Sequence, residues 1–484
     1  MITYDKLYIG GQWVAPSSNA VIDVVSPHSE EVIGRVPEAK EADIDRAVAA
    51  ARDAFDNGPW QWTPPAERAA LMDKLGAALT ARSEQLATTI TQENGCPIGF
   101  STIAQVGAAS MILNYFTQLA REFAFEEVRP GMMGPAIVRR EPVGVVAAVV
   151  PWNVPLFAII LKLAPALAAG ATVVVKPAPE TPLDAMILAE ALQEAGVPPG
   201  VVNIVATGRE VGEHLVRHPG IDKIAFTGST AAGRRIAAIA GEQLKRVTLE
   251  LGGKSAAIIL DDADLNQAIP SLVPAMVMNN GQACVAQTRV LAPRERYQDV
   301  VDAIVANIGM MQVGDPMDYL TVVGPLVSSR QRERVEGYLK IGKDEGARVA
   351  LGGGRPKHLD RGWYVEPTVF IDVNNGMRIA QEEIFGPVVA VIPYDDDKDA
   401  LRIANESDYG LSGTVWTADN DRGLDVARRV RTGSYSVNGF AMEFGAPFGG
   451  FKNSGIGREL GPEGLNAYLE AKTIHMPFGW ERQL

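Results

Sequence analysis

Cys284 is the residue whose surroundings first indicate chemistry. It ends the segment Gly281-Gln282-Ala283-Cys284, a glycine-containing turn with a small residue that leaves a thiol approachable. A single cysteine in a globular protein is usually an inert core residue. Glu250, 34 residues upstream in an apolar stretch before two glycines, favours another interpretation. An apolar setting raises a carboxyl pKa towards the range of a general base, so the two residues predict a nucleophile and its base.

Asn153 is a third polar residue in an apolar context, because Pro151-Trp152 precede it and Val154 follows. Its amide is suited to donate to a developing oxyanion. An Asn that satisfies the backbone of a proline-rich turn is the alternative that the residue alone leaves open.

A phosphate site is indicated where Gly228, Ser229 and Gly233 lie between an apolar run and a helical stretch. Backbone N–H groups at such a strand-to-helix turn, with the helix dipole, favour a phosphate. The spacing G-x-x-x-x-G differs from the usual dinucleotide fingerprint G-x-G-x-x-G. An ordinary tight turn therefore stays open as an equal alternative.

The elements that must position these residues alternate between short β-branched runs and Ala/Leu/Glu-rich helical stretches, which predicts an α/β fold. Strands buried on both faces are expected at 145–150, 172–175, 202–205 and 223–226, with a helix at 183–194. A second sheet is expected from runs at 256–260, 288–291, 369–371, 388–391 and 413–416. Residues 123–141 predict a protruding hairpin, and 472–476 its partner strand.

Composition narrows the class of protein. The formal charge of -13 disfavours a nucleic-acid partner, and two cysteines suit a reducing cytosol. No export signal opens the chain, and the most apolar region, 158–175, contains Lys162, Pro165 and Gly170. We therefore expect a cytoplasmic protein without a membrane span, with 158–175 in its core.

Seven segments, in this order along the chain, resemble the aldehyde dehydrogenase superfamily of NAD(P)-dependent, non-acylating type. They are Pro151-Trp152-Asn153, Lys176-Pro177, Phe226-Thr227-Gly228-Ser229-Thr230, Leu249-Glu250-Leu251-Gly252-Gly253-Lys254, Gly281-Gln282-Ala283-Cys284, Glu382-Glu383-Ile384-Phe385-Gly386-Pro387 and Pro447-Phe448-Gly449-Gly450. The resemblance extends from the opening residues 7–13 to the end of the chain.

The resemblance implies a mechanism. Cys284 attacks the aldehyde carbonyl, Asn153 and the Cys284 backbone N–H hold the thiohemiacetal oxygen, and hydride passes to the nicotinamide. Water activated by Glu250 then hydrolyses the thioester to a carboxylic acid. Glu459 is expected either to relay protons to Glu250 or to belong to a structural ion-pair network.

It also implies a cofactor site for NAD. Lys176 is expected at the adenosine ribose, Gly228 and Ser229 at the pyrophosphate, and Glu383 and Phe385 at the nicotinamide riboside. The same site is expected to include Val150, Pro151, Trp152, Pro179 and Leu251. Pro179 replaces an acidic ribose ligand of many NAD-preferring members, so we expect NADP to be tolerated.

The substrate channel implied by the resemblance is apolar throughout. We expect it to be lined by Val154, Phe157, Ala158, Leu161, Ala283, Val285, Phe440, Phe444 and Phe448. The absence of an arginine argues against semialdehydes, and the small Ala158 and Leu161 favour branched, aromatic or terpenoid aldehydes.

The expected architecture is an aldehyde dehydrogenase-like fold: a Rossmann-like NAD(P)-binding domain (1–122 and 142–252), an α/β catalytic domain (253–453) and a small β oligomerisation flap (123–141 and 454–484). The flap predicts a homodimer or homotetramer. Arg246, Arg458 and Glu470 are expected to brace the subunit contact, and Cys96 to be packing. His214 and His218, four apart on a predicted helix, are interpreted as a surface helix end, with no metal site.

A CoA-acylating semialdehyde dehydrogenase and a catalytically silent structural member of the fold remain the alternatives.

Overall fold

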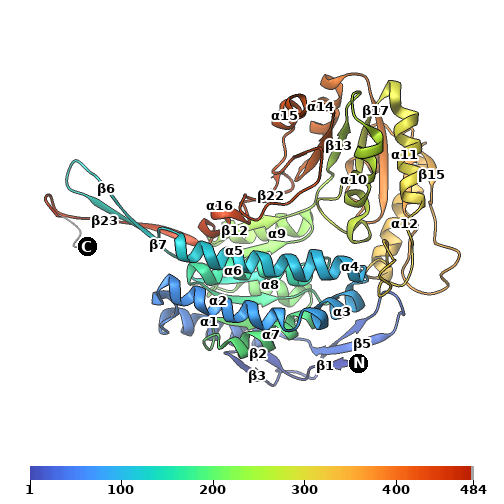
Figure 1. The fold of residues 1–484 in the computed structure, drawn as a ribbon. Coiled ribbons are helices and arrows are strands. Elements are labelled where there is room, and N and C mark those ends of the chain that lie inside the picture. The colour runs from blue at the N-terminus through green and yellow to red at the C-terminus, as the bar shows by residue number, and fades with distance from the viewer. Residues whose placement is uncertain (481–484) are drawn as a thin grey trace.

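The first of two large sheets has eight strands in the order β22-β12-β11-β8-β9-β10-β2-β3 (Figure 1). The computed structural model describes residues 1–480. The five central strands are parallel, and every residue of β8 and β9 is buried, as expected for strands covered on both faces. The strands are β2 (Leu7–Ile9), β3 (Gln12–Val14), β8 (Val145–Val149), β9 (Thr172–Lys176), β10 (Val202–Ile204), β11 (Lys223–Thr227), β12 (Arg246–Glu250) and β22 (Gly455–Ile456).

Helices cover both faces of this sheet and form a separate apolar cluster on each. One face carries α1 (Glu41–Asp56), α8 (Arg209–Arg217) and α9 (Thr230–Glu242). The other carries α2 (Pro65–Thr80), α3 (Ser83–Asn94), α5 (Ala108–Glu122), α6 (Pro155–Ala169) and α7 (Leu183–Ala195). Proline at its first position starts α6, and Gly170, with a φ of 91°, ends it.

The second sheet has seven strands in the order β15-β16-β17-β14-β13-β19-β20, parallel except for β15. They are β13 (Ala256–Ile259), β14 (Arg289–Pro293), β15 (Arg348–Leu351), β16 (Thr368–Ile371), β17 (Val388–Tyr394), β19 (Gly413–Trp416) and β20 (Ser436–Val437). The helices around it are α10 (Leu265–Val277), α11 (Tyr297–Gly309), α12 (Ser329–Asp344), α13 (Arg378–Gln381), α14 (Asp397–Asn405) and α15 (Asn420–Arg429).

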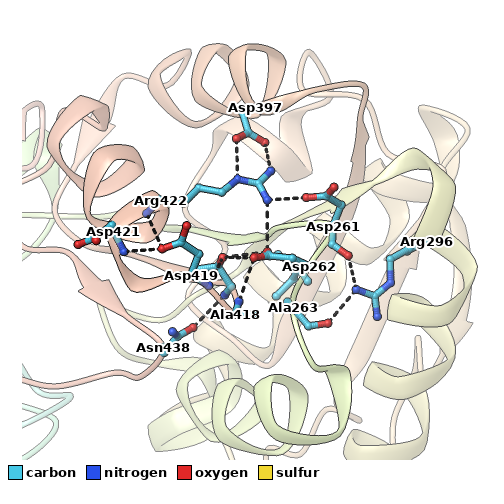
Figure 2. Close-up of polar contacts among 12 residues, drawn as sticks. Asp261, Asp262, Ala263, Arg296, Asp397, Ala418, Asp419, Asp421, Arg422 and Asn438 are labelled. Atoms are coloured by element: carbon cyan, nitrogen blue, oxygen red, sulfur yellow. Dashed lines mark hydrogen bonds and ion pairs between the residues drawn. The ribbon is translucent and has the colours of Figure 1, made fainter.

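A polar network closes the carboxyl end of the second sheet (Figure 2). Arg422 of α15 pairs with Asp397 at 2.7 Å, with Asp261 at 2.7 Å and with Asp262 at 3.4 Å. The guanidinium lowers the pKa of the Asp261 carboxyl by hydrogen bonding. Arg296 adds bonds to the Asp261 and Ala263 carbonyls. The network therefore ties α14, α15 and the segment after β13 together.

An arm of three antiparallel strands extends from the body on the left of Figure 1. It consists of β6 (Glu126–Arg129), β7 (Ala136–Pro142) and β23 (Leu469–His475), with β7 in the middle. The prediction of a hairpin paired with a C-terminal strand is confirmed. Its tip residues Met132 and Met133 are 98% and 90% exposed.

Smaller elements complete the described chain. They are β1 (Ile2–Thr3), β4 (Val21–Val25), β5 (Val32–Pro37), the 3-10 turns Trp60–Trp62 and Arg294–Arg296, α4 (Ile98–Phe100), the π-helical turn Ser101–Gly107, the turn η3 (Met278–Gly281), β18 (Tyr409–Gly410), β21 (Phe451–Lys452) and α16 (Gly461–Asn466).

The expected strands and α7 match the observed ones to within three residues at their ends, where the assignment of boundaries is least sharp. The apolar region 158–175 is buried as predicted, in α6 and β9. Within residues 1–480, no helix has the length and apolar character needed to cross a membrane.

Candidate active site

The predicted catalytic residues gather where the two large sheets face each other. Glu250 ends β12, and Asn153 follows β8 on the carboxyl side of the first sheet. Cys284 and Glu383 precede β14 and β17, on the amino side of the second sheet. Ligands of open α/β sheets bind beyond the carboxyl ends of the strands, so this junction is the expected place for a site.

Two glycines allow the Cys284 loop to pack tightly. A Cβ on Gly253 would lie 2.2 Å from the Cys284 carbonyl oxygen, and one on Gly281 would lie 2.1 Å from the backbone of Gly386. Gly281 also has a φ of 73°, which disfavours other residues. The loop of residues 279–284, here called the nucleophile loop, therefore packs tightly between the segments that contain Gly253 and Gly386.

The Cys284 thiol is partly buried, and burial raises its pKa to about 12. The carboxylates of Glu383 and Glu250 add to the rise, while the backbone N–H groups of Cys284 and Val285 oppose it. The thiol is thus protonated at neutral pH in the free protein. Its activation requires a base or a nearby positive charge.

Asn153 is 6% exposed and lies against the nucleophile loop. Its Nδ2 donates to the Gln282 carbonyl oxygen at 2.8 Å, two residues before Cys284. A carboxamide nitrogen carries two hydrogens, so one remains for an oxyanion beside the thiol.

Glu250 is 3% exposed, and neither of its carboxylate oxygens has a hydrogen-bond partner. Burial raises the pKa of this carboxyl well above its usual value, and the charge of Glu459 raises it further. A Cβ on Gly449 would lie 2.7 Å from Glu250 Oε1, so the segment that contains Gly449 encloses the carboxylate. A buried carboxylate with a raised pKa and no hydrogen-bond partner has the properties expected of a general base.

Glu459 forms a buried ion pair with Lys162 of α6, at 2.8 Å between Oε1 and Nζ. Lys162 also donates to Thr227 Oγ1 at 2.6 Å, and Oε2 of Glu459 has no partner. The ion-pair interpretation of Glu459 is therefore correct. Since Glu459 also acts on the pKa of Glu250, the relay interpretation stays a prediction.

Three of the predicted cofactor residues, Lys176, Gly228 and Ser229, lie at the carboxyl ends of strands of the first sheet. Ser229 is the N-cap of α9 and accepts from the Ala232 N–H at 3.3 Å, while the Gly228 N–H donates to the Glu250 carbonyl at 3.0 Å. Lys176 ends β9 with a buried ammonium whose pKa burial lowers to about 8. The Lys176 Nζ donates to the Pro177 carbonyl at 3.1 Å, which leaves two of its three N–H donors for a ligand.

The segment from Glu383 to Phe385 forms the opposite wall. Glu383 accepts from the Gly253 N–H at 2.9 Å, and burial raises its pKa to about 7. Phe385 has a φ of 65°, strained for an aromatic residue, and its ring meets Trp152 edge-on with centroids 5.4 Å apart. Gln331 and Arg334 of α12 hold this backbone through the Phe385 and Glu383 carbonyls, at 2.7 and 2.6 Å.

Four further predicted cofactor residues are buried or half-buried. Val150 and Leu251 are 3% and 6% exposed, and Pro151 is half-buried. Pro179 is also half-buried, and the acid that follows it, Glu180, pairs with Arg330 at 3.1 Å.

Comparison with known proteins decides the family. The model of the Aldehyde dehydrogenase family matches residues 13–474. The chain belongs to this family. The resemblance read from the seven segments is confirmed, and so is the α/β fold class.

Relatives and solved structures of the family cover almost the whole chain. A geranial dehydrogenase of Castellaniella defragrans is 49% identical over 476 residues, which are 98% of this chain and 99% of the relative. The crystal structure of a Mycobacterium tuberculosis aldehyde dehydrogenase complexed with NAD+ has 51% identity and a TM-score of 0.98, covering 99% of this chain and 100% of that one. That of Pseudomonas syringae aldehyde dehydrogenase C, a mutant complexed with NAD+ and octanal, has 42% identity and a TM-score of 0.95, covering 97% and 96%.

In this aldehyde dehydrogenase, the predicted channel residues lie in the same apolar cluster as Cys284. Those within it are Val154, Phe157, Ala158, Leu161, Ala283, Val285, Phe440, Phe444 and Phe448. Tyr115, Met278 and Met442 belong to the same cluster and were not predicted.

Lys162 is a buried charged residue beside the candidate site that the sequence interpretation left out. Its signal was present, because a lysine in an otherwise apolar helix needs a buried partner.

The remaining candidates divide between structure and surface. Cys96 is fully buried, with Sγ 2.8 Å from Ser101 Oγ, as expected for packing. Arg246 pairs with Glu470 at 2.7 Å, and Arg458 donates to the Gly450 and Gly457 carbonyls. The expected role of the three residues at a subunit contact stays a prediction.

The histidine pair needs one correction. His214 lies on α8, but His218 lies beyond its end, because the helix stops at Arg217. Both face Asp45, at 2.7 and 3.5 Å. Among residues 1–480, no group of three or more His, Cys, Asp or Glu side chains is arranged to hold a metal.

Proposed function

We propose that this member of the family oxidises an apolar aldehyde to the carboxylic acid, with NAD as the oxidant and a covalent intermediate on Cys284. The observation that carries the proposal is the Glu250 carboxylate, which is buried and unpartnered and acts electrostatically on the Cys284 thiol. A carboxylate kept unpartnered at an energetic cost is one available to take a proton from water.

The residues divide the reaction into two steps. The Cys284 thiol releases its proton to solvent as its sulfur bonds to the aldehyde carbon, and the free Asn153 N–H with the Cys284 backbone N–H stabilises the resulting oxyanion. The chemistry that NAD supplies when bound is removal of hydride from that carbon, which leaves a thioester on the sulfur. Glu250 then takes a proton from a water molecule while the water oxygen attacks the thioester carbon. The carbon–sulfur bond breaks, which releases the carboxylic acid and leaves Cys284 as a thiolate. In this proposal Glu459 and Lys162 pass that proton onward.

The residues at the cofactor side fit a dinucleotide. Ser229 begins α9, where backbone N–H groups face a pyrophosphate, and Lys176 retains free donors for a ribose hydroxyl. Glu383 would accept from the nicotinamide ribose, and Trp152 and Phe385 would border the ring. Val150, Pro151 and Leu251 complete the proposed site.

Tolerance of NADP is part of the proposal. Pro179 provides no carboxylate to repel a 2'-phosphate, and Glu180 beside it is held by Arg330.

The proposed substrate class rests on the predicted channel residues, which are all apolar and lie in the same apolar cluster as Cys284. The relative named geranial dehydrogenase and the structure determined with octanal concern apolar aldehydes, which supports the same class here. The relative named 3-succinoylsemialdehyde-pyridine dehydrogenase, 43% identical over 479 residues, makes semialdehydes a necessary comparison.

The organisation we propose keeps an NAD(P)-binding domain (1–122 and 142–252), a catalytic domain (253–453) and oligomerisation segments (123–141 and 454–484), of which 481–484 lie outside the described residues. The exposed edges and tip of the arm support a homodimer or homotetramer. We also propose a cytoplasmic location and no nucleic-acid partner.

The experiment is the initial rate of NADH or NADPH formation with aliphatic, aromatic, terpenoid and carboxylate-bearing aldehydes, without CoA. Aldehydes of six or more carbons should give a higher kcat/KM than acetaldehyde. Cys284→Ala should abolish turnover, whereas Cys96→Ala, the matched change of the buried thiol, should not. Turnover that appears only with CoA would replace the proposal by the acylating reaction, and no turnover with any aldehyde by a silent member of the fold.

A further inference from the structure

We infer that Asn279 is a positioning residue that sets the oxyanion donor Asn153 at the correct distance from the Cys284 sulfur. The inference rests on the proposed function, because it assumes that Asn153 and Cys284 perform the covalent chemistry. Asn279 belongs to η3, five residues before the nucleophile, and its side chain is directed away from the solvent with 2% exposure.

Asn279 and Asn153 hold each other through the Gln282 carbonyl. The Asn279 Nδ2 donates to the Asn153 carbonyl oxygen at 2.7 Å and reaches the Gln282 carbonyl oxygen at 3.3 Å. The Asn153 Nδ2 donates to that same Gln282 oxygen at 2.8 Å. Backbone and side chain of the oxyanion residue are therefore both tied to the loop that presents the nucleophile.

This ring of bonds joins segments that belong to different sheets. Asn153 follows β8 of the first sheet, whereas Asn279 and Gln282 precede β14 of the second. Without the bonds, the distance between oxyanion donor and sulfur would depend on how the two sheets pack overall. With them, the distance is set locally, as preorganised catalysis requires.

Two further amides, from α3 and the π-helical turn Ser101–Gly107, contact the Asn153 carbonyl. Asn94 Nδ2 donates to it at 3.3 Å and to the Trp152 carbonyl at 2.7 Å, and Gln105 Nε2 approaches it at 3.5 Å. Both side chains are fully buried. Asn279 makes the shortest of the three contacts and is the one supplied by the nucleophile loop.

Comparison with the neighbouring Asn280 distinguishes the positioning role of Asn279 from simple packing. Both residues have left-handed backbones, with φ of 51° and 59°. Asn280 donates to the Gly95 and Pro325 carbonyls and accepts from the Gly324 N–H. The Asn279 side chain donates to the two carbonyls of the ring, and its Oδ1 has no partner. Asn280 holds distant backbone, while the bonds of Asn279 go to the oxyanion residue and the nucleophile loop.

The test is a double-mutant cycle on the single-turnover burst of NADH, with Asn279→Gly and Asn153→Ala alone and combined. Glycine tolerates the left-handed backbone and removes the whole side chain, including the amide. Misplacement of a catalytic group by about 1 Å can cost on the order of 100-fold, so we expect Asn279→Gly to slow the burst by about 10- to 100-fold. The dissociation constant of NAD should stay within about twofold. In the Asn153→Ala background Asn279→Gly should slow the burst no further, because a residue that acts through another is not additive with it.

Asn280→Gly is the matched control, and we expect it to lower the Tm while the burst rate stays within about twofold. The inference would be overturned if Asn279→Gly slowed the burst by the same factor in the unaltered protein and in Asn153→Ala, or if the burst of Asn279→Gly were unchanged. If Asn279→Gly does not fold, Asn279→Asp enters the same cycle, since a carboxylate cannot donate to either carbonyl. An unchanged burst in Asn153→Ala alone would instead contradict the proposed function, which keeps the two failures distinct.

Discussion

The Lys162 ammonium and the Glu459 carboxylate form an ion pair at 2.8 Å, with side-chain exposures of 0% and 2%. Such a pair, removed from water on both sides, is costly to break by deleting one partner, because the other charge stays buried. We expect Lys162→Met to lower the free energy of unfolding by about 3 to 5 kcal/mol. Urea denaturation measures this change.

The double variant Lys162→Met/Glu459→Leu provides the control for that ion pair. Replacing both charges by apolar groups should recover most of the lost stability, since no charge remains unpaired. A double variant as unstable as the sum of the two single variants would contradict this account of the pair.

Glu250 should control the second chemical step and leave the first intact. We expect Glu250→Gln to retain the burst of NADH and to lower the steady-state rate by about 10²- to 10⁴-fold, the usual contribution of a general base. Rapid-mixing absorbance at neutral pH separates the two phases. A lost burst with a normal rate of hydrolysis of the preformed thioester would refute the assignment.

The pH dependence of hydrolysis follows from the raised pKa of Glu250. Because the base acts in its ionised form, the hydrolysis rate should rise with pH through that pKa. The charge of Glu459 is one cause of the raised pKa, after burial. Glu459→Gln should therefore shift the rise to lower pH, and Arg246→Gln, which alters a surface pair, should leave it in place. A profile that moves in the opposite direction would show that Glu459 does not act on Glu250 in this way.

The sequence predicted the strands well because fully buried parallel strands are continuous apolar runs, as in 172–175. It could assign candidate catalytic residues because their motifs are local, within a few positions of Cys284, Glu250 and Asn153, and those assignments stay predictions. It did not assign Lys162 a role, because its partner Glu459 lies 297 residues away. It also did not predict the left-handed backbone of Asn279, which is fixed by tertiary bonds and not by neighbouring residues.

A buried pair of acids should make stability fall as pH rises. Glu93 accepts from the Leu183 N–H at 2.9 Å and the Asp184 N–H at 3.3 Å, and Asp184, fully buried, has no partner for either oxygen. Burial raises the pKa of Asp184 to about 8 and, with the charge of Asp184, the pKa of Glu93 well above its usual value. A raised carboxyl pKa means that the folded state holds protons that the unfolded state releases. The stabilising contribution of the protonated carboxyls is complete below their pKa in the unfolded state, and it is lost as pH rises through their pKa in the folded state.

Thermal unfolding between pH 5 and pH 9 tests this linkage. The Tm should decrease towards pH 9, and Asp184→Asn should make the decrease shallower, because an amide does not titrate. Asp264→Asn, a change at the exposed N-cap of α10, is the matched control and should leave the slope unchanged. An equal slope in Asp184→Asn and the unaltered protein would exclude this pair as the origin.

Cofactor choice should depend on residue 179, in the middle of the loop between β9 and α7. A carboxylate there would accept from the ribose hydroxyls of NAD and repel the 2'-phosphate of NADP. We therefore expect Pro179→Glu to raise the ratio of the NADP to the NAD dissociation constant by about 10-fold or more, a coupling of about 1.4 kcal/mol. Fluorescence titration with each dinucleotide measures both constants. Glu180→Gln is the matched control, since Glu180 is already engaged by Arg330 at 3.1 Å and should contribute little to the ratio. If Glu180→Gln changes the ratio and Pro179→Glu does not, the carboxylate that discriminates between the cofactors is Glu180, and the protein prefers NAD without an acid at position 179.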